Sequence, residues 1–178
     1  MYAGHAAIAL VAKAKRPRIP IAVLVAAAYG PDWVAWIFEL LRRQTEVASH
    51  SLVSLGFGAT VAALIYFLFT RQRVDALVVG LTYVSHWPAD FITGIKPTWP
   101  GGPEVGLLLY AHPVADVIVE SIVIVACWIV YRRSLPPRSR RAKIGWLVPA
   151  GLIALQIGSA LIQVPAVKEP LTSRLRAL

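Results

Sequence analysis

Long apolar runs separated by short basic stretches are the main pattern along this chain of 178 residues. An α-helix needs about 20 mostly apolar residues to cross the hydrocarbon core of a membrane. Four runs have about this length: residues 52–70, 74–93, 114–131 and 145–164. The pattern therefore predicts an all-α membrane protein.

A fifth apolar run, residues 19–41, is long enough to span but contains Gly30, Pro31 and Asp32. We expect Pro31 to kink this helix, because proline cannot donate the backbone hydrogen bond of a helix interior. An apolar segment at residues 2–12 precedes it and is about half a membrane long. These elements predict a single integral membrane domain over residues 1–178, a polytopic helical bundle of about five transmembrane helices plus an N-terminal half-helix.

A cleaved signal peptide is the alternative interpretation of the N-terminal region. Residues 13–18 would be its basic part and residues 26–28 its cleavage site. An apolar segment precedes the basic cluster, however, and the apolar run continues beyond the alanines. We therefore favour a membrane span.

The composition also points to a membrane protein. Apolar residues make up 57% of the chain and charged residues 15%, and the mean hydropathy is +0.64. Soluble domains contain about 25% charged residues, so the composition excludes a disordered chain or a coiled coil and argues against a water-soluble enzyme. The single Cys127 lies inside an apolar run and has no second cysteine to pair with.

Basic residues outnumber acidic ones by 18 to 9, which gives a net charge of +9. Basic patches can bind nucleic acid, but these fall between apolar runs, where they act as topology signals and contact lipid headgroups. Six of them lie in one set of loops: Arg42, Arg43, Lys96, Lys168, Arg174 and Arg176. Twelve lie in the other set: Lys13, Lys15, Arg16, Arg18, Arg71, Arg73, Arg132, Arg133, Arg138, Arg140, Arg141 and Lys143. The positive-inside rule places the larger set in the cytoplasm, and the 96–111 loop and the C-terminus outside.

The acidic residues within predicted spans include Asp32, Asp90, Asp116 and Glu120. Ionisable groups inside a membrane are costly and mark a functional site by default. His86 and Asp90 are four residues apart and share one helix face, as do Asp116 and Glu120. At about 1.5 Å per residue, these five groups lie about 17–24 Å from the cytoplasmic edge, between the midplane and the outer interface.

Three predicted spans thus converge on one polar layer. His5 counts to about 12 Å and approaches the layer from below, whereas His50 counts to about 30 Å and reaches it only if its helix tilts or dips. Imidazoles and carboxylates are suitable ligands for zinc or manganese, and a metal would offset the cost of burying several acids. Interhelical hydrogen bonds without a metal are the alternative. His112, beside Pro113 at the outer interface, needs no ligand role.

Four short segments carry these potential ligands in order along residues 1–110. They are Gly4-His5, Pro31-Asp32, Ser49-His50-Ser51 and Ser85-His86-Trp87-Pro88-Ala89-Asp90, followed by the stretch 94–100, which ends in Trp-Pro. The set resembles the Gly-His, Pro-Asp, His-Arg-Gly-x-Thr-His-Ser and Ser-His-x-x-Ala-Asp motifs of the membrane-bound metal-dependent hydrolases, the LexA-regulated type and its relatives. This resemblance implies metal binding by His5, Asp32, His50, His86 and Asp90. It does not extend to Asp116 or Glu120.

Two positions depart from the family's pattern. Val34 stands where the family often has a second Asp, and Thr45 replaces the first His of its His-Arg-Gly-x-Thr-His motif. A second metal would therefore require Glu46, Asp116 or Glu120 as a substitute ligand. Loss of activity is the other consequence of these departures.

Four tryptophans and a proline-rich loop lie on the outer side of the predicted bundle, and each has a structural and a functional interpretation. Four tryptophans fit either an interfacial aromatic belt or the lining of a substrate entrance: Trp33, Trp36, Trp87 and Trp99. The loop at residues 96–103 contains three prolines and should be stiff. It is either a tight connection or a lid in which Lys96 offers a cation to an anionic headgroup.

We predict a membrane-embedded, metal-dependent hydrolase that acts on a lipid-like, phosphoester or ester substrate near the outer leaflet. Zinc is the expected cofactor and manganese the second choice. The expected ligands are His5, Asp32, His50, His86 and Asp90, with Asp90 alternatively orienting His86, and Glu120 or Asp116 is the candidate general base. The alternatives are a transport protein that carries a cation or protons and a catalytically inactive membrane scaffold. We expect a multi-pass protein of the prokaryotic cell (inner) membrane, with membrane lipids as partners and no nucleic acid.

Overall fold

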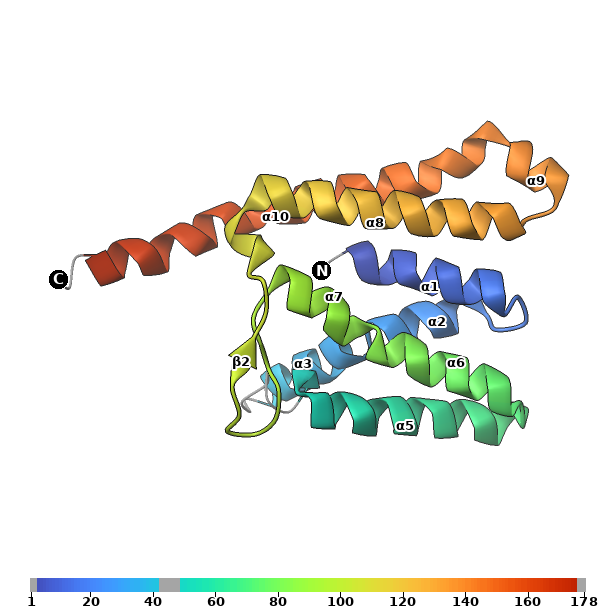
Figure 1. Ribbon diagram of the computed structural model, residues 1–178, viewed down its shortest axis with the longest axis horizontal. Helices are drawn as coiled ribbons and strands as arrows, with labels where there is room; N and C mark the ends of the chain where they lie inside the picture. Colours follow the sequence, from blue (N-terminus) through green and yellow to red (C-terminus); the bar gives the residue numbers. More distant parts are fainter. Residues whose placement is uncertain (1–2, 42–48, 176–178) are drawn as a thin grey trace.

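The computed structural model of the chain is a helical bundle with one short β-hairpin (Figure 1). It describes the backbone of residues 3–41 and 49–175 and the side chains of residues 3–41 and 49–162. The α-helices in this part of the chain are α1 (Ala3–Lys15), α2 (Ile21–Ala28), α3 (Gly30–Leu40), α5 (Leu52–Thr70), α6 (Arg73–Val84), α7 (His86–Thr93), α8 (Pro113–Ser134), α9 (Pro137–Arg141) and α10 (Leu147–Leu175). Strands β1 (Lys96–Pro97) and β2 (Glu104–Val105) pair antiparallel, and the 3-10 turns are η1 (Leu109–Ala111) and η2 (Lys143–Trp146). The prediction of an all-α fold is confirmed.

The helices pack side by side in an order that places the short α1 in the middle. Helix α1 contacts α8 on one side and α2 on the other, while α10 packs on α8. On the far side, α2 contacts α6, and α6 packs along α5 (Figure 1). His5, which is carried by α1, therefore lies deep in the bundle.

Three helical segments are long and apolar enough to cross a membrane: Leu52–Thr70, Pro113–Ser134 and Lys143–Ile162. Helices α2 and α3 pass the same test only as a pair, with a bend of 59° between them. This bend lies beside Pro31, where the sequence predicts a kink. The described residues thus give three candidate spans, or four if the bent pair counts as one, and the prediction of five spans is not confirmed.

Residues 74–93 do not form the single span predicted from their hydropathy. Helix α6 ends at Val84, and α7 begins at His86 after a break at Ser85. Pro88 explains the break, because it has no N–H to donate and its ring would clash with the carbonyl of Val84 in a continuous helix. The break lets α7 turn His86 and Asp90 inward independently of the direction of α6.

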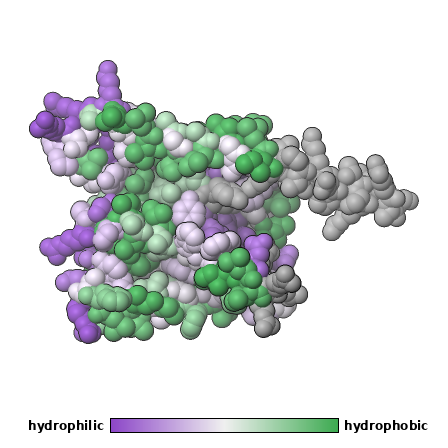
Figure 2. Space-filling view, turned by 180° about the vertical axis from the view of Figure 1, so that it is seen from behind, coloured by the Kyte–Doolittle hydropathy of each residue, from purple (hydrophilic) through white to green (hydrophobic). Residues whose placement is uncertain are grey.

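The outer surface of the candidate spans is apolar, and many polar side chains are buried inside the bundle. Large apolar side chains point outward along the candidate spans, including Phe57 (73% exposed), Phe69 (87%) and Ile162 (78%). Figure 2 shows hydrophobic residues over much of the viewed face. Lipid tails cannot hydrogen-bond, so polar groups are expected to gather inside. The buried polar side chains include His5, His50, Asp75, His86, Asp90, Asp116, Glu120 and Gln156.

The ring of Tyr83 in α6 fits between Gly30 of α3 and Gly58 of α5 and determines how closely these three helices pack. A Cβ atom at Gly30 would lie 2.1 Å from Cε2 of Tyr83, and one at Gly58 would lie 2.4 Å from its hydroxyl oxygen. A Cβ at Gly56, by contrast, would meet nothing within 4 Å. This contact fixes the start of α3, and with it the position of Asp32.

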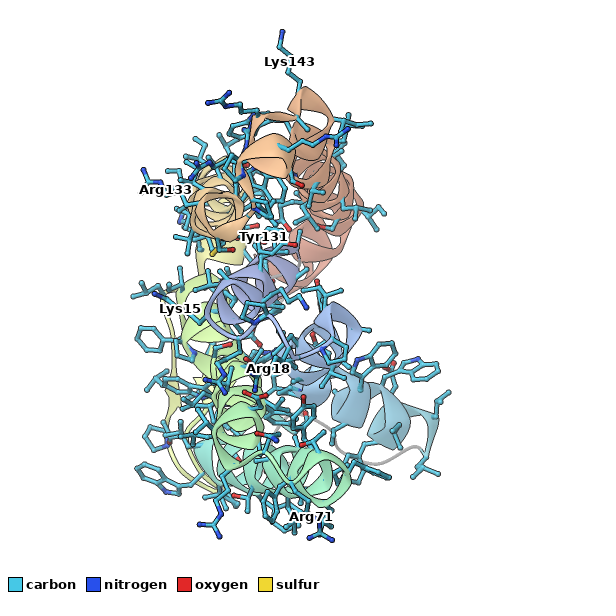
Figure 3. The ribbon with its side chains drawn as sticks, turned by 90° about the vertical axis from the view of Figure 1, so that its right-hand side faces the viewer. Lys15, Arg18, Arg71, Tyr131, Arg133 and Lys143 are labelled. Atoms are coloured by element: carbon cyan, nitrogen blue, oxygen red, sulfur yellow. The ribbon has the colours of Figure 1, made fainter. Side chains whose placement is uncertain are left out.

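Basic residues gather at one end of the bundle, opposite the hairpin. Lys15, Arg18, Arg71, Arg133 and Lys143 all lie at the end that faces the viewer in Figure 3. They belong to the larger set of basic residues, so the structure places loops of that set on a common side. Which side of the membrane this is stays a prediction. In the smaller set, Arg42, Arg43, Lys168, Arg174 and Arg176 lie outside the described side chains.

Candidate metal centre

Five side chains from four parts of the chain meet inside the bundle. The ligand atoms of His5, Asp32 and His86 all lie within 4.8 Å of one another, as do those of His50, His86 and Asp90. Four of these side chains are buried, whereas the side chain of Asp32 is 48% exposed. The structure therefore brings together all five residues that the sequence marks as metal ligands.

Several pairs of ligand atoms in the cluster lie as far apart as two ligands of one metal ion. His86 Nε2 lies 3.3 Å from His50 Nε2, 3.5 Å from Asp32 Oδ1 and 3.2 Å from Asp90 Oδ2. His50 Nε2 lies 3.3 Å from Asp32 Oδ1 and 3.5 Å from Asp90 Oδ2. Ligands at about 2.0–2.2 Å from a tetrahedral Zn²⁺ are about 3.3–3.6 Å apart. His50, His86 and Asp90 therefore have the spacing of three ligands of one zinc-sized cation, and Asp32 has that spacing from the two histidines.

The hydrogen bonds of His86 leave its Nε2 available to a cation. His86 Nδ1 lies 2.8 Å from the carbonyl oxygen of Ala28, which can only accept, so Nδ1 carries the proton. In a neutral ring Nε2 then carries a lone pair instead of a proton. This lone pair nevertheless faces two carboxylate oxygens and another ring nitrogen. A metal ion, a second proton on this ring, or a hydrogen bond donated by His50 in its Nε2–H tautomer would each offset this repulsion. An Nδ1–H bonded to a carbonyl is the usual arrangement of a metal-binding histidine.

His5 contacts the opposite oxygen of the Asp90 carboxylate. Its Nε2 lies 3.2 Å from Asp90 Oδ1, and its ring stacks on His86 with the centroids 3.9 Å apart. The buried Nδ1 of His5 has no hydrogen-bond partner among the described residues. Asp90 therefore links His5 to the two histidines that face its Oδ2.

His50 reaches the site although the depth count places it too near the outer interface. Residues 49–50 are helical, but Ser51 has an extended backbone and caps α5, so His50 is not on the α5 helix. Counting along a straight span therefore misplaces it. The hydroxyl of Ser49 lies 2.7 Å from His50 Nδ1 and fixes the ring.

Asp116 and Glu120 are both buried in α8, as the depth argument predicts. Glu120 Oε2 accepts a hydrogen bond from the backbone N–H of Gly4 at 3.1 Å. Gln156 of α10 accepts from the N–H of Ala3 at 3.4 Å and donates to Asp116 Oδ2 at 2.8 Å. These groups hold the N-terminus of α1 to α8 and α10. Their role as general base stays a prediction.

A pocket of about 530 Å³ opens onto the cluster. This volume is in the range of small-molecule sites, about 300–1,000 Å³. Asp32, Asp90 and Lys96 form its polar wall. The aromatic walls come from Tyr29, Trp33, Trp36 and Tyr110. Neither Asp116 nor Glu120 is among the described residues that line it.

The β-hairpin places Lys96 in this pocket. Lys96 pairs with Val105 in the hairpin, and its Nζ lies 3.5 Å from Asp90 Oδ2. The carbonyl of Thr98 accepts a hydrogen bond from the N–H of Leu52 at 2.9 Å, at the start of α5. The expected stiff loop is thus a hairpin that is fastened to the bundle.

Some residues near the site were not singled out from the sequence. Tyr29 meets the His5 ring edge-on, with the centroids 5.6 Å apart. Tyr110 hydrogen-bonds with Thr93, and burial raises the pKa of its hydroxyl, so the proton stays on. Gln156 could have been found as an amide within an apolar run, where a partner is needed.

The two departures from the family's motifs have different outcomes. Val34 lines a separate apolar pocket with Phe38 and Phe57, so its side chain does not join the cluster. Thr45, and Glu46 as a substitute ligand, lie outside the described residues. His112 is exposed.

Comparison of the chain with protein-family models, with curated proteins and with solved structures finds no match. The resemblance to the membrane-bound metal-dependent hydrolases therefore rests on the motifs alone.

Proposed function

We propose that this protein is a membrane-embedded, metal-dependent hydrolase. The observation that carries the proposal is the lone pair of His86 Nε2, which faces three potential ligand atoms at 3.2–3.5 Å, the distance between two ligands of one metal ion. His50, His86 and Asp90 would hold the metal, zinc in the first place and manganese in the second, which leaves a position open for water or substrate on the side of Asp32. His5 orients Asp90 through its contact with Oδ1. When bound, the metal supplies Lewis acidity to an ester or phosphoester oxygen and activates water.

The pocket gives Asp32 the proton-transfer role in this proposal. Its side chain is 48% exposed and lines the pocket, so it can take a proton from an attacking water. The water oxygen bonds to the phosphorus or carbonyl carbon, and the ester bond to the leaving alcohol breaks. The proton taken up by Asp32 then passes to that alcohol.

Metal analysis with a matched pair of histidine variants tests the proposal. The full chain, purified in detergent with zinc or manganese supplied, is expected to hold about one metal ion. His86→Ala should lose this metal, because it removes the Nε2 ligand, whereas the exposed His112→Ala should keep it. Inductively coupled plasma mass spectrometry measures the metal, and size-exclusion chromatography shows that both variants remain folded.

Unchanged metal content in His86→Ala, or a wild-type protein that binds neither metal, would contradict the metal centre. Hydrolysis is measured separately, as release of phosphate, fatty acid or alcohol from phosphoester and ester lipids. Stoichiometric metal without any hydrolysis would instead support the cation-transport alternative.

A further inference from the structure

We infer that the pocket beside the metal centre selects an anionic phosphoester lipid and that Lys96 recognises its phosphate. The inference rests on the proposed function, because it requires a divalent metal between Asp32 and Asp90. It narrows the substrate from esters in general to lipid phosphates.

The charge balance of the pocket favours an anion. Asp32 and Asp90 bring two negative charges, which a divalent metal neutralises, and imidazoles bind metal in their neutral form. Lys96 then leaves one positive charge, and it is the only Lys or Arg among the described residues that line the pocket. Without the metal, the same three side chains sum to one negative charge and would favour a cation. Anion binding should therefore require both Lys96 and the metal.

Lys96 is held where it can contact a bound phosphate and the metal centre together. Its side chain is only 16% exposed, and Nζ lies 3.5 Å from Asp90 Oδ2. The hairpin fixes its backbone through pairing with Val105, so the ammonium group is not a loose surface charge. An ammonium group has three donors, and one contact with Asp90 leaves donors for a phosphate oxygen.

The outer face of α3 provides a path for the apolar part of the same molecule. Trp33, Trp36, Ile37 and Leu40 follow the i, i+3, i+4, i+7 spacing of one helix face. Each is between 51% and 63% exposed. Because Trp33 and Trp36 also line the pocket, this face continues directly from it. A lipid can thus place its phosphate at Lys96 and its acyl chains along α3, with the tryptophans at the membrane interface.

Native mass spectrometry of the zinc-loaded full chain in detergent tests this selection. The probes are a non-hydrolysable phosphonate analogue of dioleoyl phosphatidic acid, neutral dioleoylglycerol, and soluble glycerol 3-phosphate. Lys96→Met should weaken binding of the phosphonate lipid by at least about tenfold, since it removes a hydrogen bond between charged groups. Lys96→Arg keeps the charge and should retain most of the binding. Lys15→Met, at the basic end of the bundle, is the matched control and should have no effect at this site.

The outcomes separate this inference from the proposed function. Equal binding of the phosphonate lipid and dioleoylglycerol, or equal losses in Lys96→Met and Lys15→Met, would overturn the inference while bound metal still supports the hydrolase. Binding of glycerol 3-phosphate as tightly as the lipid would show a soluble phosphate site and overturn the lipid assignment. A Lys96-dependent preference for the phosphonate lipid that survives removal of the metal would overturn the inference, because its charge balance requires the metal, whereas the metal content of the wild-type chain tests the proposed function separately. Loss of the preference on metal removal is the expected result.

Discussion

Glu120 of α8 provides a test of how the N-terminal helix holds His5 in the site. Its Oε2 accepts a buried hydrogen bond from the N–H of Gly4, the residue before His5. Glu120→Leu leaves this N–H without its acceptor, which costs about 1–3 kcal/mol. For a chain of this size, each kcal/mol lowers Tm by about 2–4 °C, so the expected loss is about 2–12 °C. Glu120→Gln keeps an acceptor oxygen in place and should change Tm much less.

The same two variants separate an anchoring role of Glu120 from general-base catalysis. An anchor predicts that Glu120→Gln keeps its metal and most of its activity, while Glu120→Leu also binds metal more weakly because His5 is displaced. Removal of a general base lowers the rate by about 10²–10⁴-fold. The assays are thermal unfolding in detergent, metal content and hydrolysis rate. If Glu120→Gln keeps the wild-type Tm and metal content but loses activity by that factor, the anchoring role is refuted. If Glu120→Leu keeps the wild-type Tm, the predicted cost of leaving the Gly4 N–H without an acceptor is refuted.

Two further predictions concern packing and topology. Gly58→Ala should lower Tm, because its Cβ would lie 2.4 Å from the hydroxyl oxygen of Tyr83, and overpacking costs about 1–3 kcal/mol. Gly56→Ala meets nothing within 4 Å and should leave Tm equal or higher; similar Tm values for the two variants would contradict the wedge role of Tyr83. In a Cys127→Ser background, an impermeant thiol reagent added outside cells should label the exposed Glu104→Cys and not Ser139→Cys. The reverse pattern would invert the predicted orientation and move the site toward the inner leaflet.

Hydropathy predicts the straight helices well, because length and apolar content are what a membrane span requires. The run at residues 52–70 and helix α5 have the same bounds. Hydropathy alone does not show where a helix breaks, so residues 74–93 were predicted as one span. Pro88 is the signal in the sequence that could have shown the break.

The candidate ligands were predictable because charged groups in apolar runs have few ways to be stabilised. Depth counting brought Asp32, His86 and Asp90 to one level, but it failed for His50, whose short helical turn lies outside the α5 axis. The contacts of Lys96 with Asp90 and of Glu120 with Gly4 join residues that are distant in the sequence. A single sequence carries no spacing signal for such pairs, so only the folded chain shows them.

The hairpin is connected to two of the segments that carry candidate ligands. It bonds to the start of α5, two residues after His50, and the N–H of Leu107 just beyond it donates to the carbonyl of Phe91, next to Asp90, at 2.7 Å. A displacement of the hairpin would therefore pull on both segments while also withdrawing Lys96 from the pocket. A molecule that entered the pocket by displacing the hairpin would therefore also move the candidate ligands.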